Sequence, residues 1–417
     1  MSKFIVETSE PLKGKIRTDG AKNAVLPIIA ASLMAEGKCI IEDVPDLSDV
    51  HTMCELIRIL GAEVRFENNR LEICADNIIN RELPYEPVKK IRASFLLAAP
   101  LLTRFSKVRI QMPGGCPIGI RPIDLHLKGF ARMGAEIRQE FGMIELTADK
   151  LGGNEIYLDF PSVGATENII MAAALAEGVT VISNAATEPE ITDMSEFLNK
   201  MGAQIEGAGT ETVRIRGVDR LYAAKHRVIP DRIEAGTFLA AAAITGGDVR
   251  IENVIPEHLR AVISKLKEMN FGIEEDDDSV RIYKNDDIKS VDIKTMPYPA
   301  FPTDLQPQFM SLMTTMNGTC IINETIFENR FQHVGELSRM GANIKLEGKS
   351  AIIKGGNRLT GAEVKATDLR AGAGLIIAAL CAEGKSEIGD IYHIERGYCR
   401  IEEKLKALGA KIEKLDI

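Results

Sequence analysis

The alternation of apolar and polar positions repeats six times along the chain. In each copy, the last turn of an amphipathic helix leads into a stretch where every second residue is apolar, which is the pattern of a half-buried strand. A Gly-Ala pair joins the two in most copies, and successive copies are 68 to 73 residues apart. The six residues at this turn are Gly61, Gly134, Gly202, Asn270, Gly341 and Gly409. Six units of about 70 residues therefore account for nearly the whole chain.

The residue at the turn is the one that ends the helix. A helix commonly ends on a residue in the left-handed conformation, which glycine adopts at little cost and a residue with a Cβ adopts with strain. Asparagine is the next-best residue there, so the fourth copy, with Asn270, still fits the pattern.

An earlier helix in each unit is apolar almost all the way round. Clear examples are residues 28–36, 171–177, 239–245 and 375–383. A helix of this kind is expected to be buried, whereas the later helix of each unit has a polar face and is expected to cover a surface. The pattern therefore predicts two domains, each with three units around a core of small-residue helices. A linear solenoid is the alternative, but solenoid repeats are usually shorter, about 20 to 45 residues.

Composition narrows the class of function. The 417 residues carry 51 basic and 60 acidic side chains, a net charge of −9, and no Lys/Arg-rich stripe, which disfavours a nucleic-acid partner. The absence of Trp also disfavours a base-stacking surface. The seven cysteines are scattered and form no C-x-x-C pair, which argues against a disulfide framework or a zinc site. We expect a cytoplasmic protein with no metal and no cofactor, because neither a signal peptide, an apolar span of ~20 residues nor a dinucleotide or P-loop motif is found.

Charged residues recur where the buried helices begin. The equivalent positions in the six units are Lys22, Arg92, Gly164, Arg232, Asp304 and Arg370. A cation at a helix N-terminus opposes the helix dipole, so several of them together indicate a bound anion. Asp304 and Asp368 have a second interpretation as plain N-caps, and both interpretations stay open. The pattern predicts an anionic small-molecule substrate bound between two domains.

A loop rich in Gly and Pro carries one cysteine. Residues 113–122 contain three Gly and three Pro, which excludes a helix or a central strand. Beside Arg121, the thiol of Cys116 is either an acid, base or nucleophile or an incidental cysteine, and the spacing alone does not decide. His126 is a weak candidate for its base, because no third group that would orient the ring is evident; a hydrogen bond within the loop or a ligand contact is the alternative.

Seven motifs give the chain a resemblance to the UDP-N-acetylglucosamine 1-carboxyvinyltransferases, a family of enolpyruvyl transferases. They are Gly20-Ala-Lys-Asn-Ala, Arg92-Ala-Ser, Pro113-Gly-Gly-Cys-Pro-Ile-Gly-Ile-Arg-Pro, Pro230-Asp-Arg-Ile-Glu-Ala-Gly, Phe301-Pro-Thr-Asp-Leu-Gln-Pro-Gln, Phe327-Glu-Asn-Arg-Phe and Arg396-Gly-Tyr. The resemblance implies an α/β fold of the inside-out barrel type, with three units of about 70 residues in each domain. It also implies one domain of residues 22–229, a second of residues 1–21 plus 230–417, and an active site in the cleft between them.

The resemblance further implies the reaction. The enolpyruvyl group of phosphoenolpyruvate would pass to the 3-hydroxyl of UDP-N-acetylglucosamine by addition and elimination, with release of phosphate. This is the first committed step of peptidoglycan precursor synthesis, and so serves cell-wall formation, cell shape and cell division. The two substrates would be the only partners expected; the oligomeric state stays unknown.

Site residues follow from the same resemblance. Cys116 would be the general acid, form a phospholactoyl adduct and be the target of fosfomycin; Asp304 would be the base, with Lys22 and Arg396 also catalytic. Phosphoenolpyruvate would be held by Lys22, Arg121, Arg370 and Arg396, assisted by Arg92 and Arg330. The nucleotide sugar would be held by Asn23, Arg121, Pro122, Ile123, Asp124, Leu125, Ser162, Val163, Gly164 and Ile326. Asp368 and Glu188 would support these groups.

The chain departs from the family at two positions, and two other functions are alternatives. Phe160 stands where many members have Lys, which puts one nucleotide-phosphate contact in doubt, and Ile123 replaces a common Val, a neutral change. The alternatives are 3-phosphoshikimate 1-carboxyvinyltransferase, which lacks the cysteine loop, and a non-catalytic or regulatory nucleotide-sugar-binding paralogue. The latter is expected to lack one of Lys22, Cys116, Asp304 and Arg396, and all four are present.

Overall fold

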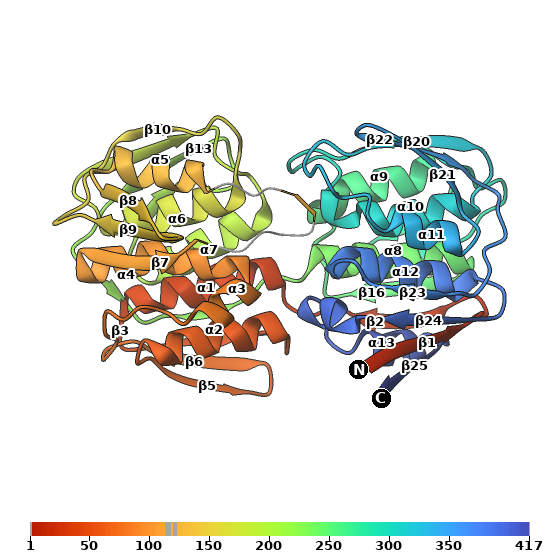
Figure 1. The fold of residues 1–417 in the computed structure, drawn as a ribbon, viewed down its shortest axis with the longest axis horizontal. Coiled ribbons are helices and arrows are strands. Elements are labelled where there is room, and N and C mark those ends of the chain that lie inside the picture. The colour runs from red at the N-terminus through yellow and green to blue at the C-terminus, as the bar shows by residue number, and fades with distance from the viewer. Residues whose placement is uncertain (1, 113–117, 120–122, 417) are drawn as a thin grey trace. The chain divides into compact units, whose positions relative to one another are not determined.

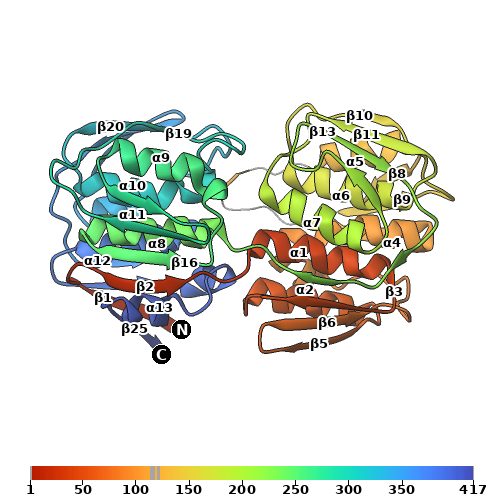
Figure 2. The same cartoon turned by 180° about the vertical axis from the view of Figure 1, so that it is seen from behind.

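The computed structural model describes residues 2–112, 118–119 and 123–416, and contacts divide them into two compact units. Unit 1 contains residues 2–19, 118–119 and 230–416, and unit 2 contains residues 20–112 and 123–229. Within each unit the helices lie inside and the sheets outside (Figure 1). The view from behind shows the same layering in each unit (Figure 2). This is the inside-out α/β architecture predicted from the sequence, with three repeats in each unit.

Buried helices form the centre of unit 2. They are apolar on nearly every side, and nine of the ten residues of α1 are buried. The central helices are α1 (Lys22–Ala31), α4 (Ala98–Phe105) and α6 (Val163–Ala174), with the 3-10 turns η1 (Ser32–Met34) and η2 (Arg92–Leu97). The other helices are α2 (Ser48–Ile59), α3 (Tyr85–Lys90), α5 (Asp124–Arg132) and α7 (Pro189–Lys200).

The three larger sheets of unit 2 are built of antiparallel neighbours. Two of these sheets also have one parallel strand at an edge. The first sheet has the order β15 (Lys225–Arg227), β4 (Lys38–Glu42), β6 (Arg70–Cys74), β5 (Glu63–Glu67). The second is β7 (Lys107–Gln111), β9 (Met143–Thr147), β8 (Glu136–Glu140). The third is β10 (Glu155–Tyr157), β11 (Val179–Ser183), β13 (Thr212–Arg216), β12 (Gln204–Glu206), and a short pair joins β14 (Leu221–Tyr222) to β3 (Ala35–Glu36).

Unit 1 has the same plan around one apolar core. Its central helices are α8 (Arg232–Thr245), α10 (Gln306–Thr315) and α12 (Leu369–Cys381), and all three contribute to a single buried cluster. The other helices are α9 (Arg260–Glu268), α11 (Val334–Arg339) and α13 (Ile401–Ala407), and the 3-10 turns are η3 (Pro256–Leu259), η4 (Thr303–Leu305) and η5 (Ile391–Arg396).

Both ends of the described chain lie in one sheet of unit 1. This sheet has the order β23 (Glu363–Lys365), β24 (Lys385–Gly389), β1 (Ser2–Glu7), β25 (Lys411–Asp416), so the first strand completes the last repeat (Figure 1). The other sheets are β17 (Gly272–Glu275), β18 (Ser279–Tyr283), β16 (Asp248–Glu252), β2 (Lys13–Arg17), and β19 (Ile293–Lys294), β20 (Thr319–Asn323), β22 (Ser350–Lys354), β21 (Asn343–Glu347).

The turn residues of all six repeats have the predicted left-handed conformation. Their φ angles run from 77° at Asn270 to 106° at Gly202. Asn270 also donates a hydrogen bond from its side-chain amide to the carbonyl of Asp286, at 2.7 Å. This bond explains how the one non-glycine copy keeps the conformation.

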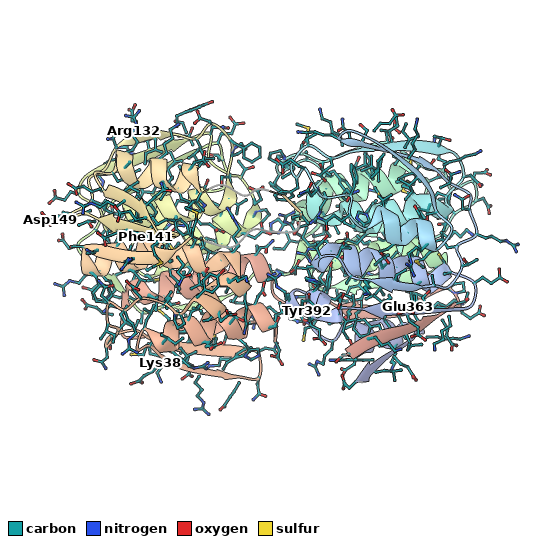
Figure 3. The ribbon with its side chains drawn as sticks, in the orientation of Figure 1. Lys38, Arg132, Phe141, Asp149, Glu363 and Tyr392 are labelled. Carbon is teal, nitrogen blue, oxygen red and sulfur yellow. The ribbon has the colours of Figure 1, made fainter. Side chains whose placement is uncertain are left out.

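The outer faces and turns carry the charged side chains. Lys38, Arg132, Asp149 and Glu363 are exposed on the surfaces of their units, and Phe141, at the β8–β9 turn, is 95 % exposed (Figure 3). Among the described residues, no helix combines the length and the apolar character that a membrane span requires.

Candidate functional site

Three charged side chains of unit 1 meet where two central helices begin. Asp304 lies on η4, directly before α10, and Arg370 lies in the first turn of α12. Oδ2 of Asp304 accepts hydrogen bonds from Nε and Nη2 of Arg370, at 3.1 and 3.0 Å. Its Oδ1 accepts one from Nη2 of Arg330, at 3.2 Å. Three of the residues predicted for the site therefore share one network.

Arg330 lies at the buried end of this network. Its guanidinium donates to the carbonyl of Thr303 at 3.2 Å, and its Nη1 lies 3.6 Å from Oδ1 of Asp368. The residue is 1 % exposed. A buried guanidinium requires negative charge nearby, and the two carboxylates provide it.

The two aspartates at the helix starts have different structural roles. Asp368 is the N-cap of α12, because its Oδ1 accepts from the backbone amides of Arg370 and Ala371 at 2.9 and 3.1 Å. Asp304 binds the two arginines, and its side chain is 26 % exposed, against 2 % for Arg330 and 4 % for Arg370. A carboxylate that reaches solvent from a buried cationic support is suited to accept a proton from a substrate hydroxyl.

The protonated form of Arg370 is stabilised by its neighbours although the side chain is buried. Burial disfavours the charged form, but the neighbouring Tyr398, Asp304 and Asp231 raise the pKa of Arg370 above its ordinary value. The guanidinium also lies over the ring of Tyr398, 5.3 Å from its centre. Arg370 is therefore a fixed positive charge at the start of α12, available to an anion.

Glu324 was not predicted, although it orders the loop that carries Ile326. It is 1 % exposed, and its Oε1 accepts from the backbone amides of Ile326 and Phe327 at 2.8 and 3.2 Å. Its Oε2 accepts from the hydroxyl of Thr303 at 2.9 Å. Glu324 thus ties the Ile326 loop to the turn that carries Asp304. The only sequence signal was an acidic residue directly after a buried strand.

The described part of the cysteine loop lies against this Ile326 loop. The backbone amide of Asn329 donates to the carbonyl of Ile118 at 3.0 Å. Gly119 has a φ of +146°, and a Cβ there would lie 2.4 Å from Oε2 of Glu328. The conformation favours glycine, and a side chain here would also require the Glu328 carboxylate to move.

Arg396 ends η5 in unit 1 and is half-buried. Together with burial, which is the larger effect, its positive charge lowers the pKa of His393. The positive charge of Arg396 therefore affects its neighbour His393. Arg396 lies two residues before Tyr398 in the chain.

In unit 2, Lys22 has a buried counter-ion. It is the first residue of α1 and is 7 % exposed, and its Nζ lies 2.6 Å from Oδ2 of Asp49 in the first turn of α2. The cations at the helix starts are thus compensated by carboxylates in two cases, Lys22 by Asp49 and Arg370 by Asp304. The sequence could not reveal the first pair, because Asp49 belongs to a different helix.

His126 is held as a neutral ring. Its Nδ1 accepts a hydrogen bond from the amide of Asn168 at 2.9 Å, so the proton belongs on Nε2. Burial, with a smaller effect from the charge of Arg92, lowers the pKa of His126 to about 3. A ring of this kind is a poor base, so the structure favours hydrogen bonding over the Cys116–His126 pair. The orienting group is Asn168, which no sequence pattern singled out.

The ring of His126 faces the start of α6. A Cβ at Gly164 would lie 3.1 Å from Cε1 and 3.3 Å from Nε2 of His126, so glycine allows the close approach. Ser162 is the N-cap of α6, its Oγ accepting from the amide of Ala165 at 3.4 Å, and Val163 is the first residue of the helix. Phe160, at the position of a family Lys, is 45 % exposed.

The remaining predicted residues of unit 2 lie at helix starts. Asn23 is exposed on α1, and Arg92 begins η2 and is half-buried. Ile123 is buried just before α5, Asp124 is its exposed first residue, and Leu125 is half-buried. Cys116, Arg121 and Pro122 lie outside the described residues.

Three glutamates gather near the start of α7 in unit 2. Glu188 is the N-cap residue of α7, Glu190 lies in its first turn, and Glu167 lies on α6. Burial, together with the charges of Glu190 and Glu188, raises the pKa of Glu167 well above its ordinary value. Glu188 was expected near the site; Glu167 and Glu190 were not, because only the packing of α6 on α7 brings them together.

The chain is similar to known proteins over its full length. Residues 6–405 match the family model of EPSP synthase (3-phosphoshikimate 1-carboxyvinyltransferase). The UDP-N-acetylglucosamine 1-carboxyvinyltransferase 1 of Caldanaerobacter subterraneus subsp. tengcongensis is 61 % identical, over 99 % of both chains. The enzymes named UDP-N-acetylglucosamine 1-carboxyvinyltransferase 2 of Carboxydothermus hydrogenoformans and of Clostridium tetani are each 55 % identical, over 100 % of both chains.

Solved structures agree with this similarity. The enolpyruvyl transferase NikO from Streptomyces tendae superposes with a TM-score of 0.90 and 26 % identity, over 99 % of this chain and 98 % of the other. An EPSP synthase from Acinetobacter baumannii has a TM-score of 0.77 and 19 % identity over 100 % of both chains, a likeness of fold.

Proposed function

The chain belongs to the EPSP synthase family, and we propose that it transfers the enolpyruvyl group of phosphoenolpyruvate to the 3-hydroxyl of UDP-N-acetylglucosamine with release of phosphate. The observation that carries this function is the full-length identity of 55 to 61 % to three enzymes named for that reaction. The shikimate-using relative shares only 19 %. The two alternatives raised by the sequence, 3-phosphoshikimate 1-carboxyvinyltransferase and a non-catalytic paralogue, are not favoured.

The chemistry requires a base, an acid and fixed cations. In the addition step, Asp304 would take the proton of the sugar hydroxyl while the hydroxyl oxygen bonds to C2 of phosphoenolpyruvate. At the same time an acid would protonate the vinyl CH₂. In the elimination step, the conjugate base of this acid would take a proton from the new methyl group, the C=C double bond would form again, and the C2–O bond to phosphate would break, so that phosphate leaves. The placement of Asp304 between Arg330 and Arg370 supports the first role. Cys116, from the resemblance, remains the proposed acid.

Residues of both units are proposed to serve the two substrates. Arg370, Arg396, Lys22 and Arg121 would bind the phosphate and carboxylate of the donor, with help from Arg92 and Arg330. Ser162, Val163, Gly164, Asn23, Ile326 and residues 121–125 would bind the nucleotide sugar. The support for these roles is that several of the described members, namely Lys22, Arg370 and residues 162–164, lie at helix N-termini, where backbone amides face an anion.

The proposal also includes where the enzyme acts in the cell, what its product supplies and what inhibits it. The enzyme would act in the cytoplasm, supply peptidoglycan synthesis and thus cell division, and be inhibited by fosfomycin through alkylation of Cys116. Fosfomycin should inactivate the wild type with time, and a mass increase equal to one inhibitor should map to the peptide containing Cys116.

Release of phosphate tests the reaction. Wild-type protein mixed with phosphoenolpyruvate and UDP-N-acetylglucosamine should release phosphate in amounts equal to the enolpyruvyl sugar nucleotide formed. Shikimate 3-phosphate as the control acceptor should give no release. Release with the control acceptor alone would assign the chain to the other reaction, and no release with either would leave a binding protein.

A further inference from the structure

Tyr398 occupies a polar network in the apolar core of unit 1. It is 2 % exposed, and its hydroxyl lies 2.9 Å from Oγ1 of Thr237 on α8 and 3.1 Å from Nε2 of Gln308 on α10. The same amide nitrogen of Gln308 lies 3.1 Å from Oγ1 of Thr237. Thr237 is 2 % and Gln308 0 % exposed, so the three polar groups have only protein around them.

Counting protons gives one consistent direction for each of these hydrogen bonds. The hydroxyl of Thr237 donates to the carbonyl of Ile233 at 2.8 Å, so its oxygen only accepts from the other two groups. The two amide protons of Gln308 then go to Thr237 and Tyr398, and Tyr398 donates to Thr237. Each hydroxyl proton has one acceptor. These mutual hydrogen bonds hold the three side chains in one geometry, although Oε1 of Gln308 has no hydrogen-bond partner among the described residues.

The ring held in this way supports Arg370. The guanidinium lies over the ring, 5.3 Å from its centre, and its Nε and Nη2 donate to Asp304. The backbone amide of Tyr398 donates to the carbonyl of Ile394 at 3.1 Å, which fixes the ring to η5, the turn that ends at Arg396. Tyr398 is thus tied by its hydroxyl to α8 and α10 and by its backbone amide to η5.

We propose that Tyr398 is a positioning residue: its ring, fixed by Thr237 and Gln308, sets the orientation of Arg370 and through it that of Asp304. The inference rests on the proposed function, in which Arg370 binds the donor anion. A cation on an aromatic face keeps its direction while losing water, which is the condition for binding an anion in a defined geometry.

Two substitutions separate the ring from its hydroxyl. Tyr398→Leu removes the surface under Arg370, and we expect the KM for phosphoenolpyruvate to rise roughly tenfold and kcat to fall by a similar factor. Tyr398→Phe keeps the ring but frees it from the network, so we expect a smaller rise, about threefold. The Kd of UDP-N-acetylglucosamine, measured by calorimetry, should stay within about twofold in both.

Phe309→Leu is the matched control. Phe309 is also fully buried in unit 1, on α10, but it packs on Phe301, an apolar neighbour. It should lower the melting temperature without changing the KM for phosphoenolpyruvate. Should Tyr398→Leu raise that KM no more than Phe309→Leu does, the ring is only a core residue and the proposal is wrong.

A second readout does not depend on turnover. Phosphoenolpyruvate bound to the wild type should raise its melting temperature, and Tyr398→Leu should lose most of this rise while Phe309→Leu keeps it. If the wild type is inactive but shows this difference, the proposed function fails and the positioning role stands. If the wild type is active and the variants keep both the rise and the KM, only the positioning role fails.

Discussion

At the scale of single residues, the pairing of Asp304 with two arginines decides what its loss should do. Asp304→Asn keeps the shape but removes the negative charge between Arg330 and Arg370. We expect kcat to fall at least about a hundredfold, because general base catalysis contributes on the order of 10² to 10⁴. The KM for phosphoenolpyruvate should change little, since the arginines remain. Steady-state phosphate release checks this, and an unchanged kcat would remove Asp304 from the role of base.

Two substitutions of Cys116 test whether it acts as a general acid, because serine and aspartate differ in acidity. Cys116→Ser should abolish turnover, because a hydroxyl is too weak an acid, while nucleotide-sugar binding survives. Cys116→Asp should retain activity and resist fosfomycin, because a carboxyl supplies the proton but is not alkylated in the same way. Turnover and inactivation assays on the three proteins are the measurement; normal turnover in the serine variant would contradict the acid role.

The Lys22–Asp49 pair predicts a stability effect that is separate from substrate binding. Both side chains are at most 9 % exposed, so removing one partner leaves a buried charge. Asp49→Asn should therefore lower the free energy of unfolding by about 3 to 5 kcal/mol. The double variant Lys22→Met/Asp49→Asn should be less destabilised than Asp49→Asn alone. Urea unfolding without substrates measures this, and additive losses would show that the pair is not coupled.

The sequence pattern predicted charged residues for the candidate site but not the groups that hold them. Arg370 and Asp304 recur at equivalent repeat positions, so the pattern could reveal them. Asp49, Asn168 and Glu324 lie on other elements than the residues they bind, and nothing in their local sequence marks the contact. Partners of this kind are set by tertiary packing, which single-sequence patterns do not report.

At the scale of the element, substitution by alanine is expected to have opposite effects on stability at two glycines near α11. Gly341 follows α11 with a φ of 94°, whereas Gly335 lies inside α11 with open space where a Cβ would point. Gly341→Ala should destabilise by about 1 to 2 kcal/mol, because alanine is strained in the left-handed region. Gly335→Ala should stabilise by up to about 1 kcal/mol through helix propensity. Thermal and urea unfolding of both variants give the sign, and equal signs would contradict the assignment of the turn.

The repeats explain why the elements were predictable. A period of two after each Gly or Asn turn predicted a strand, an amphipathic helix led into that turn, and an apolar helix lay earlier in the unit. Six weak local signals therefore supported one another. The pairing of strands was beyond the pattern. β1 lies between β24 and β25, at the opposite end of the sequence, and this closure of the last repeat depends on contacts across the whole unit.

At the scale of the whole molecule, each unit carries a buried neutral histidine, and this has a consequence for acid stability. Burial, the largest effect at both sites, lowers the pKa of His126 in unit 2 to about 3 and that of His333 in unit 1 to about 4. Between these values and the ordinary pKa of 6.5, the unfolded chain binds more protons than the folded one. Each histidine therefore contributes its full stability above about pH 6.5, and this contribution is lost as the pH falls.

Buried glutamates in both units change the pH dependence of stability in the opposite direction to the histidines. Burial is the largest cause that raises the pKa of Glu167, and it raises that of Glu234 to about 7. These groups favour the folded state as the pH falls toward their ordinary pKa of 4.5, so the net slope of the wild type does not isolate the histidines. Only a comparison with histidine variants at each pH does so.

His126→Gln and His333→Gln therefore make a unit-by-unit test. Each variant should lose stability at pH 7.5, because a packed ring is replaced, but should lose ~2 kcal/mol less than the wild type on going from pH 7.5 to pH 5. The measurement is urea unfolding at the two pH values, with tryptic fragments of partly unfolded protein showing which unit opens first. If the two variants and the wild type give parallel pH dependence, these rings take up their protons over the same pH range in the folded and the unfolded chain, and burial does not lower their pKa.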